Sequence, residues 1–234
     1  MPPLASYGEF MPLHYTPNIT VSAANRDWHL SRAGNIEELW EKMVADGQAS
    51  ADEHIPYWTE LWPASLVLSD WLYLNRSAIQ GRACLDVGCG IGLTALVGKS
   101  LGAHVLAMDY EPEALRYAAK NAAQNGVESP LWVCMDWARP ALAEASMDLV
   151  WGGDIMYERR FVGPVLDLCA RVLKPGGRFW VAEPGRSVYD AFLASLPERG
   201  FSGRRVHQGK THGIYEQPQA VTVSIWEITR AEQA

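Results

Sequence analysis

Long apolar runs and clustered metal ligands are both missing from this sequence. No stretch of about eighteen apolar residues occurs, so we expect no membrane span and no membrane partner. The N-terminal residues lack a basic region followed by an apolar one, so we expect no secretory signal. The 4 cysteines and 6 histidines follow no zinc-ligand or paired-thiol spacing. These absences predict a cytoplasmic protein with reduced thiols and no bound metal.

Positive charge is also scarce. The 234 residues include 20 Lys and Arg against 27 Asp and Glu, which gives a net charge of -7. Nucleic-acid binders need a clustered basic face for the phosphate backbone, so we expect no nucleic-acid partner. A basic or neutral substrate suits an acidic protein better. With 48% hydrophobic residues, the chain can bury one sizeable core without disulfide or metal support.

Two parts of the chain differ in their pattern. Residues 1–55 are polar and irregular, and Pro and Asn interrupt them. One helix is predicted there, over 35–45, because apolar residues recur at helical spacing. We interpret this part as an N-terminal extension that caps a pocket. Residues 56–234 form the predicted main domain, which begins with a helix over 64–72.

Strand-like and helix-like blocks alternate through the main domain. Strands are predicted at 83–87, 104–108, 131–135, 148–152, 178–182, 202–208 and 220–228. Helices are predicted at 93–100, 112–125, 140–145 and 161–173, and a Lys-Pro-Gly-Gly sequence ends the last of them. Strands that alternate with helices of this length form βαβ units. We therefore predict an α/β, Rossmann-like, doubly wound fold with a mostly parallel seven-stranded sheet and an N-terminal cap segment.

A glycine-rich turn after the first of these strands is the strongest local motif. Residues 85–93 read LDVGCGIGL, a strand that leads through a turn into a helix. Such a turn lets backbone N–H groups approach a ligand closely. A dinucleotide-binding loop would have glycine at position 93, where this chain has leucine, so the pattern favours S-adenosylmethionine over a nicotinamide cofactor. The alternative is an ordinary tight turn. The predicted cofactor-binding residues are Asp86, Gly88, Gly90 and Gly92.

Two further carboxylates follow the next two strands, each beside an aromatic residue. Asp109 can accept hydrogen bonds from both hydroxyls of a ribose, and Tyr110 can stack on adenine. Alternatively, Asp109 caps the helix that follows. Asp136 suits an adenine amino group, with Trp137 as an aromatic wall; alternatively, the pair forms a polar turn with a packed tryptophan. We predict that all four residues contact the cofactor.

The fourth strand ends in the sequence GGDIMYE, at the sheet edge where ligands of such folds bind. Asp154 and Tyr157 are therefore the predicted catalytic residues, and Asp154 also borders the cofactor. Alternatively, Asp154 caps the next helix. Residues 56–64 are dense in aromatics but too polar for a plain buried strand, and we single out Trp58 and Trp62 there.

Taken together, PYWTELWPASLVLSDWL, LDVGCGIGL, AMDYEP and GGDIMYE resemble the methyltransferase-16 family of protein-lysine methyltransferases. GDIMYE and AEPGR are most similar to the members that act on the beta subunit of electron transfer flavoprotein. The likeness covers roughly residues 50–230. It implies that Trp62, Gly88 and Asp109 contact S-adenosylmethionine. It also implies that residues 154–157 form an acidic-x-x-Tyr signature near the incoming amine.

This resemblance implies a protein substrate that carries lysine. Asp154 would attract and orient the ammonium, while Trp58, Trp62 and Tyr157 would remove its water. Glu183 completes the predicted substrate-binding set, and it stands where the closer relatives have Asp. Two alternatives remain open: an N-methyltransferase of small amines or pyridines, and a non-catalytic module that binds adenosylmethionine.

Overall fold

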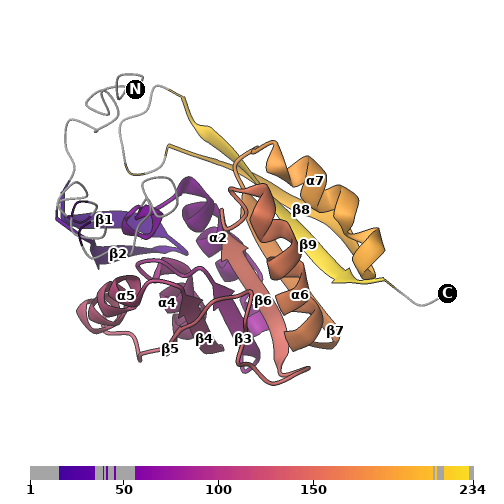
Figure 1. Ribbon diagram of the computed structural model, residues 1–234. Helices are drawn as coiled ribbons and strands as arrows, with labels where there is room; N and C mark the ends of the chain where they lie inside the picture. The colour runs from indigo at the N-terminus through magenta and orange to yellow at the C-terminus, as the bar shows by residue number, and fades with distance from the viewer. Residues whose placement is uncertain are drawn as a thin grey trace.

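A seven-stranded sheet runs through the part of the chain that the computed structural model describes, which is residues 16–34, 56–212 and 219–231 with Leu39, Glu41, Ala45 and Ile214. Figure 1 shows helices on both faces of this sheet. Among the described residues, none of the helices has the length and apolar character that crossing a bilayer requires.

The strand order is β5-β4-β3-β6-β7-β9-β8. The first five of these strands are parallel, and β9 pairs antiparallel with both β7 and β8. The bounds are β3 (Ala83–Val87), β4 (His104–Asp109), β5 (Leu131–Cys134), β6 (Met147–Gly153), β7 (Leu173–Glu183), β8 (Phe201–Thr211) and β9 (Val221–Arg230). The predicted α/β, Rossmann-like fold with a mostly parallel sheet is confirmed.

Three of the helices begin at a proline or directly after a glycine. The bounds are α2 (Pro63–Leu74), α3 (Arg76–Ile79), α4 (Leu93–Ser100), α5 (Pro112–Gln124), α6 (Val162–Val172) and α7 (Val188–Ser195). Both α2 and α5 have proline in their first turn, where its missing N–H leaves no helical bond unmade. Gly92 precedes α4 with a φ of 93°, a left-handed conformation that glycine adopts without strain.

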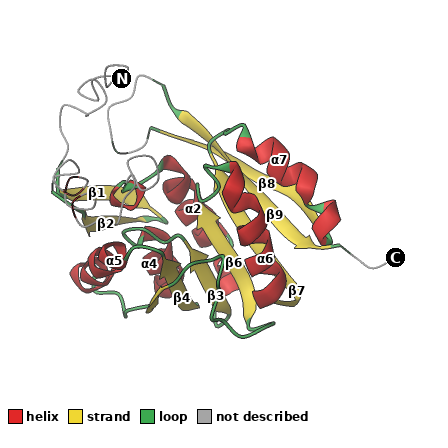
Figure 2. Cartoon of the chain, viewed as in Figure 1, coloured by secondary structure: helices red, strands yellow, loops and turns green. Residues whose placement is uncertain are grey.

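Alternating residues of the central strands feed two separate hydrophobic cores. In β7, Phe179 and Val181 pack toward α6 and α7, whereas Trp180 and Ala182 pack toward α2 and α4. Because successive side chains of a strand point to opposite faces, a strand buried on both sides is apolar throughout. Figure 2 shows the resulting layers, with the helices arranged around the strands. This arrangement fixes the sheet edge at which β3, β4, β5 and β6 end together.

The N-terminal part holds a β-hairpin that the sequence reading missed. Strands β1 (Asn18–Ala23) and β2 (Arg26–Ser31) pair antiparallel around a turn in which Ala24 and Asn25 have positive φ. The side chain of Asn121 in α5 accepts a hydrogen bond from the backbone N–H of Ser31 at 2.7 Å and donates one to its carbonyl at 3.0 Å. The prediction of an irregular lead-in is therefore wrong for residues 18–31. The helix predicted at 35–45 lies outside the described ranges.

Three other element predictions need correction. The predicted helix at 140–145 is irregular, because Arg171 of α6 takes up its backbone groups: the Arg171 carbonyl accepts from Ala145 N–H, and its Nε donates to the Leu142 carbonyl. Helix α7 was not predicted. Strand β7 begins at Leu173 rather than Arg178. The Lys-Pro-Gly-Gly sequence therefore comes just after the end of α6, as predicted, but it forms part of β7.

Candidate active site

A cavity of about 280 Å³ lies at the carboxyl ends of β3, β4, β5 and β6. The short helix η2 (Tyr57–Thr59) and the start of α2 close its other side. Of the thirteen site residues predicted from the sequence, ten line this cavity: Trp58, Trp62, Gly88, Gly90, Asp109, Tyr110, Asp136, Trp137, Asp154 and Tyr157. Asp86, Gly92 and Glu183 do not line it. The fold therefore gathers residues from five separate segments of the chain.

The glycine-rich turn needs its glycines for close approach as well as for conformation. Gly88 has a φ of 64°, and a Cβ there would lie 2.9 Å from Cγ2 of Ile155. A Cβ on Gly92 would lie 2.8 Å from Cβ of Ala118. A substitution at either position would force the loop away from its neighbours. Gly88 therefore borders the cavity, while Gly92 packs the loop against α5.

Asp86 lies behind the glycine-rich turn, not in the cavity. Its carboxylate is 1% exposed and accepts a hydrogen bond from the Thr94 hydroxyl at 2.6 Å. Burial raises the pKa of Asp86 to about 7, although the bond from Thr94 opposes the rise. The Trp151 indole also opposes the rise. Asp86 therefore joins β3 to α4 from inside the protein.

Asp109 connects the glycine-rich turn to the start of α5. Its Oδ2 accepts the backbone N–H of Gly90 at 2.7 Å, and its Oδ1 accepts that of Glu111 at 3.0 Å. Burial raises the pKa of Asp109, against the effect of these N–H groups. A carboxylate has about four acceptor sites, so Asp109 can still accept a bond from a ligand hydroxyl. The side chain faces the cavity and closes a turn just before α5, but Glu111 is the residue at the cap position of that helix.

Asp109 and the neighbouring rings fit a nucleoside. Tyr110 next to it is 59% exposed although it is aromatic, and it lines the cavity. Asp136 accepts the backbone N–H of Ala138 at 2.8 Å, which is the polar turn considered as the alternative for this pair. Trp137 also lines the cavity. Acceptors for ribose hydroxyls, a glycine-rich backbone and two aromatic faces are the groups that S-adenosylmethionine requires.

Five aromatic rings, each in contact with the next, line the cavity, and we call them the aromatic wall. They follow one another in space as Trp62, Tyr57, Tyr157, Phe161 and Trp137, with ring centroids 5.0 to 5.9 Å apart and edge-to-face packing. Tyr57 and Phe161 were not predicted as site residues. Both lie within four residues of a predicted aromatic, and only the fold reveals that their rings bridge the others.

Asp154 carries an ion pair that the sequence reading did not foresee. Both of its carboxylate oxygens accept hydrogen bonds from Arg186, Oδ1 from Nε and Oδ2 from Nη2, each at 2.6 Å. Asp154 has a φ of 54°, a conformation uncommon outside glycine. Burial raises its pKa, and the guanidinium opposes that rise. The interpretation as a helix cap does not apply, because Glu158 is the residue that precedes the next helical turn.

Arg186 also packs against Trp62, one of the rings of the aromatic wall. Its guanidinium carbon lies 5.7 Å from the centroid of the Trp62 ring. Glu183 holds the turn that carries it, since its Oε2 accepts the backbone N–H of Gly185 at 2.5 Å. Glu183 is therefore placed to support Arg186, and it does not border the cavity.

The lining of the cavity is rich in carboxylates. Of the described lining residues, Arg160 is the single base, and it pairs with Glu158 at 2.8 Å. No histidine or lysine is among them. Within the described part of the chain, no group of three or more His, Cys, Asp or Glu is placed to hold a metal ion. The acidic lining residues are Glu60, Asp109, Glu111, Asp136, Asp154 and Glu158.

Comparisons with known proteins agree with this site. The methyltransferase domain family matches residues 85–181, which include β3 through most of β7. The mouse histone-arginine methyltransferase METTL23 is 25% identical over 142 residues, covering 58% of this chain and 56% of its own length. A ubiquinone biosynthesis O-methyltransferase from Xylella fastidiosa is 30% identical over 152 residues, covering 65% of this chain and 61% of its own. The chain thus spans little more than half the length of these relatives.

One solved structure relates the fold to the cofactor. The 16S rRNA N2 G1207 methyltransferase RsmC of Thermus thermophilus, in complex with S-adenosylmethionine and guanosine, superimposes with a TM-score of 0.59. The match covers 95% of this chain and 52% of that one, at 15% identity, so it speaks for the fold alone. Residues 85–181 therefore match a methyltransferase domain, and the fold that surrounds them is the one found in the S-adenosylmethionine-bound structure.

Proposed function

We propose that this protein transfers a methyl group from S-adenosylmethionine to the side-chain nitrogen of a lysine in a protein substrate. The observation that carries the proposal is the lining of the cavity, which combines the aromatic wall with several carboxylates. Carboxylates attract an alkylammonium, and aromatic rings accept its apolar stem. The resemblance to protein-lysine methyltransferases adds to this argument.

The ion pair of Asp154 favours lysine over arginine. A guanidinium would need a carboxylate with two free oxygens to bind it in the forked geometry that orients it. Both oxygens of Asp154 are already engaged by Arg186 at 2.6 Å. A lysine amine needs no such fork, because its single nitrogen only has to reach the methyl group in line.

The lining also disfavours methylation of a phenol or of RNA. A phenol must lose its proton before it attacks, and none of the described histidines lines the cavity to accept that proton. The RsmC structure means that this fold can accept a nucleoside, so the fold does not support the expectation that nucleic acid is absent. The argument against RNA rests on the carboxylates of the lining, which would repel phosphates.

The residues of the chain divide the work between the two sides of the cavity. S-adenosylmethionine would supply the methyl group as an activated sulfonium. Gly88 and Gly90 would approach it closely, and Asp109 would accept the ribose hydroxyls. Tyr110, Asp136 and Trp137 would hold the adenine. These assignments are our proposal for the cofactor half.

On the substrate side, the main task is to bring the amine in without its proton. A lysine ammonium with a pKa of about 10.4 lies about three units from its reactive form at pH 7, or about 4 to 5 kcal/mol. The aromatic wall removes water from the ammonium, and this desolvation lowers the amine pKa. Tyr157 would line the path of the amine, and Trp58 and Trp62 would complete its apolar surroundings.

A transfer assay with tritiated S-adenosylmethionine tests the proposal. The protein is added to a lysate of its source cell, and label is followed in a denaturing gel and in a small-molecule extract. A discrete labelled band, absent with Asp154→Asn, whose acid hydrolysate contains methyl-lysine, is the expected result. Label in methyl-arginine would overturn the choice of lysine.

The same assay separates the alternatives. Label confined to the small-molecule extract would favour a small amine or pyridine as substrate, for which the aromatic wall is also suited. Label in neither fraction, together with calorimetric binding of S-adenosylmethionine, would indicate a binding module. Glu144→Gln serves as a matched control, because Glu144 is an exposed carboxylate paired with Arg171 and does not line the cavity.

A further inference from the structure

Arg186 lies where three segments of the chain meet. It follows β7, it binds Asp154 at the end of β6, and its guanidinium covers the ring of Trp62 just before α2. The Asp154 side chain is 2% exposed and that of Arg186 is 36% exposed. The protein therefore encloses the carboxylate, while the guanidinium partner is partly exposed to solvent. The backbone N–H of Asp154 also donates to the Ala182 carbonyl at 2.8 Å. This network holds Asp154 in its positive-φ conformation.

The ion pair bears directly on the reactivity of an amine. A bare carboxylate in the cavity wall would stabilise the ammonium and raise the pKa of the amine by about 1 to 3 units. That effect opposes methyl transfer, which needs the neutral amine. A guanidinium that occupies both oxygens cancels the charge locally. The other ionisable groups near Asp154 are the Glu183 carboxylate, which is tied to the Gly185 N–H, and the buried Tyr189 hydroxyl.

We propose that Arg186 is a positioning residue for methyl transfer: it neutralises Asp154 and holds it beside Trp62, so that the cavity accepts an alkylamine in its uncharged form. This inference rests on the proposed amine methylation. It assigns Asp154 the role of shaping the wall instead of holding an ammonium with a free charge.

Two variants and a control separate charge from structure. Arg186→Gln removes the cation and leaves Asp154 bare, and the double change Asp154→Asn with Arg186→Gln removes both charges. Arg199→Gln is the matched control, because the Arg199 side chain is also 36% exposed and also pairs with an aspartate, Asp167, which is 69% exposed and remote from the cavity.

The first measurement is calorimetric and needs no substrate. S-adenosylmethionine carries a positive sulfonium, whereas S-adenosylhomocysteine is neutral, so the ratio of their dissociation constants reports the charge of the cavity. In Arg186→Gln, binding of S-adenosylmethionine should strengthen about tenfold relative to S-adenosylhomocysteine. The double variant should return the ratio to the parent value. Arg199→Gln should leave it unchanged. A ratio that does not move in Arg186→Gln would overturn the inference, whatever the methyl acceptor proves to be.

The second measurement is the pH dependence of label transfer into the lysate band. In Arg186→Gln the alkaline rise of the rate should move up by about one pH unit, with about tenfold loss at pH 7 that recovers at higher pH. Arg186→Lys should retain most of the parent profile. A loss by the same factor at every pH would mean that Arg186 acts through structure alone. If label never reaches an amine but the ligand ratio shifts as expected, the proposed function fails and the charge inference stands.

Discussion

Asp154 at the cavity and Glu227 in the outer antiparallel strands are both buried, with side chains 2% and 7% exposed, yet their pKa values shift in opposite directions. Burial raises the pKa of both carboxylates. At Glu227, the hydrogen bond from Trp180 and the guanidinium groups of Arg204 and Arg178 outweigh burial, and the pKa lies below its usual range. Asp154 has Arg186 alone, and burial prevails.

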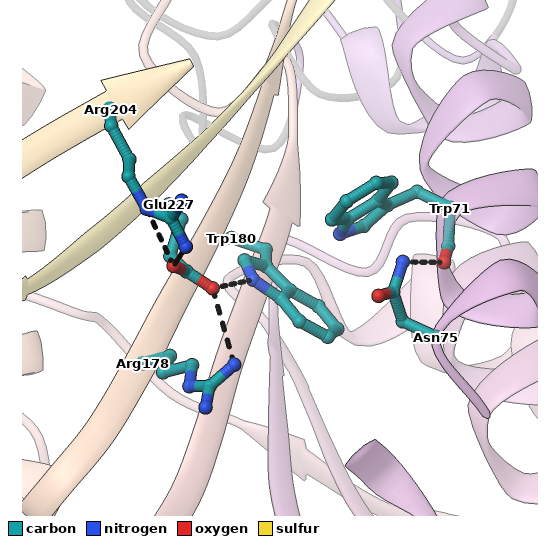
Figure 3. Close-up of polar contacts among 6 residues, drawn as sticks. All are labelled: Trp71, Asn75, Arg178, Trp180, Arg204 and Glu227. Atoms are coloured by element: carbon teal, nitrogen blue, oxygen red, sulfur yellow. Dashed lines mark hydrogen bonds and ion pairs between the residues drawn. The ribbon is translucent and has the colours of Figure 1, made fainter. Parts of the chain in front are cut away.

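Figure 3 shows how fully Glu227 is satisfied. Trp180 of β7 donates to Oε2 at 3.0 Å, and Arg204 of β8 donates to Oε1 at 2.6 Å. Arg178 reaches Oε2 at 3.4 Å. The three donors come from the two strands that flank β9, so this carboxylate ties the outer strands together.

The carboxylates at the carboxyl edge of the sheet differ from Glu227 in the direction of their pKa shifts. Asp86, Asp109 and Asp154 all have raised pKa values, because burial there exceeds the supply of donors. Binding sites commonly hold groups that a folded chain alone leaves poorly satisfied. The contrast suggests that the outer strands are built for stability, and that the cavity edge retains unfavourable charge that a ligand can relieve. The following predictions test that division, beginning with the largest effect.

Replacing Asp86 with Asn should change how stability depends on pH. A raised carboxyl pKa means that the native state holds more protons than the unfolded state between about pH 4 and 7, so this group makes stability fall as pH rises through that window. With a native pKa of about 7, the difference in unfolding free energy between parent and variant should change by up to about 4 kcal/mol from pH 4 to 8. Urea denaturation at several pH values measures it.

The matched control for this prediction is Asp148→Asn. Burial raises the pKa of Asp148, but Lys174 and the Ala83 N–H outweigh it and the pKa is lowered. This carboxylate therefore stabilises the fold above its unfolded pKa, and its contribution is lost as pH falls. The two variants should have pH slopes of opposite sign. Equal slopes would remove the contrast between a satisfied and an unsatisfied carboxylate.

Asp154→Asn should lower the rate of methyl transfer by about 100-fold or more, equivalent to about 2.7 kcal/mol in the barrier. Asn tolerates positive φ better than most residues, so the backbone should persist. The substitution leaves the glycine-rich turn intact, so the affinity for neutral S-adenosylhomocysteine should change by less than about threefold. The unpaired Arg186 cation should weaken binding of S-adenosylmethionine by up to about tenfold. Calorimetry and label transfer measure these quantities. A large loss of affinity for both ligands would instead place Asp154 among the cofactor ligands.

Much of this fold can be predicted from the sequence because its elements are locally marked. The glycine-rich turn, Pro63 and Pro112 set the starts of α4, α2 and α5, and the central strands are apolar on both faces. The hairpin at 18–31 was missed because its turn, Ala24-Asn25, lacks the usual glycine. The helix prediction at 140–145 was wrong for another reason, because the conformation of this segment depends on Arg171, about thirty residues away.

The site residues also divide into those that the local sequence marks and those that it does not. Gly88, Asp109 and Asp154 could be found because each lies at the carboxyl end of a strand, and parallel strands end at one edge. Arg186 could not be found this way, because its partner lies 32 residues earlier and nothing local marks the pair. Glu183 was assigned to the substrate from a resemblance, and its hydrogen bond to Gly185 gives it a supporting place instead. Contacts between distant segments were therefore the part that sequence reasoning lacked.

Glu227→Gln should lower the free energy of unfolding by about 1 to 3 kcal/mol, because the donors from Trp180 and Arg204 lose a charged acceptor. Label transfer per folded molecule should stay at the parent level, since Glu227 does not line the cavity. Urea denaturation gives the first value. Glu144→Gln, at an exposed surface pair, should change stability by less than about 0.5 kcal/mol. If Glu227→Gln left the free energy of unfolding unchanged, this carboxylate would not stabilise the outer strands as we propose.

Tyr157→Phe should have the smallest effect, a change of less than about threefold in label transfer. Burial raises the pKa of Tyr157 to about 12, so its phenol stays protonated through pH 9 and cannot accept the proton of the amine. Its ring, packed 5.2 Å from Tyr57 and 5.0 Å from Phe161, is what the cavity requires, and phenylalanine retains it. Tyr157→Ala, which opens the aromatic wall to water, should cost about tenfold by the same desolvation argument. If Tyr157→Phe were as damaging as Tyr157→Ala, the hydroxyl would matter more than the ring, and the cavity edge would contain a second polar group that acts on the substrate.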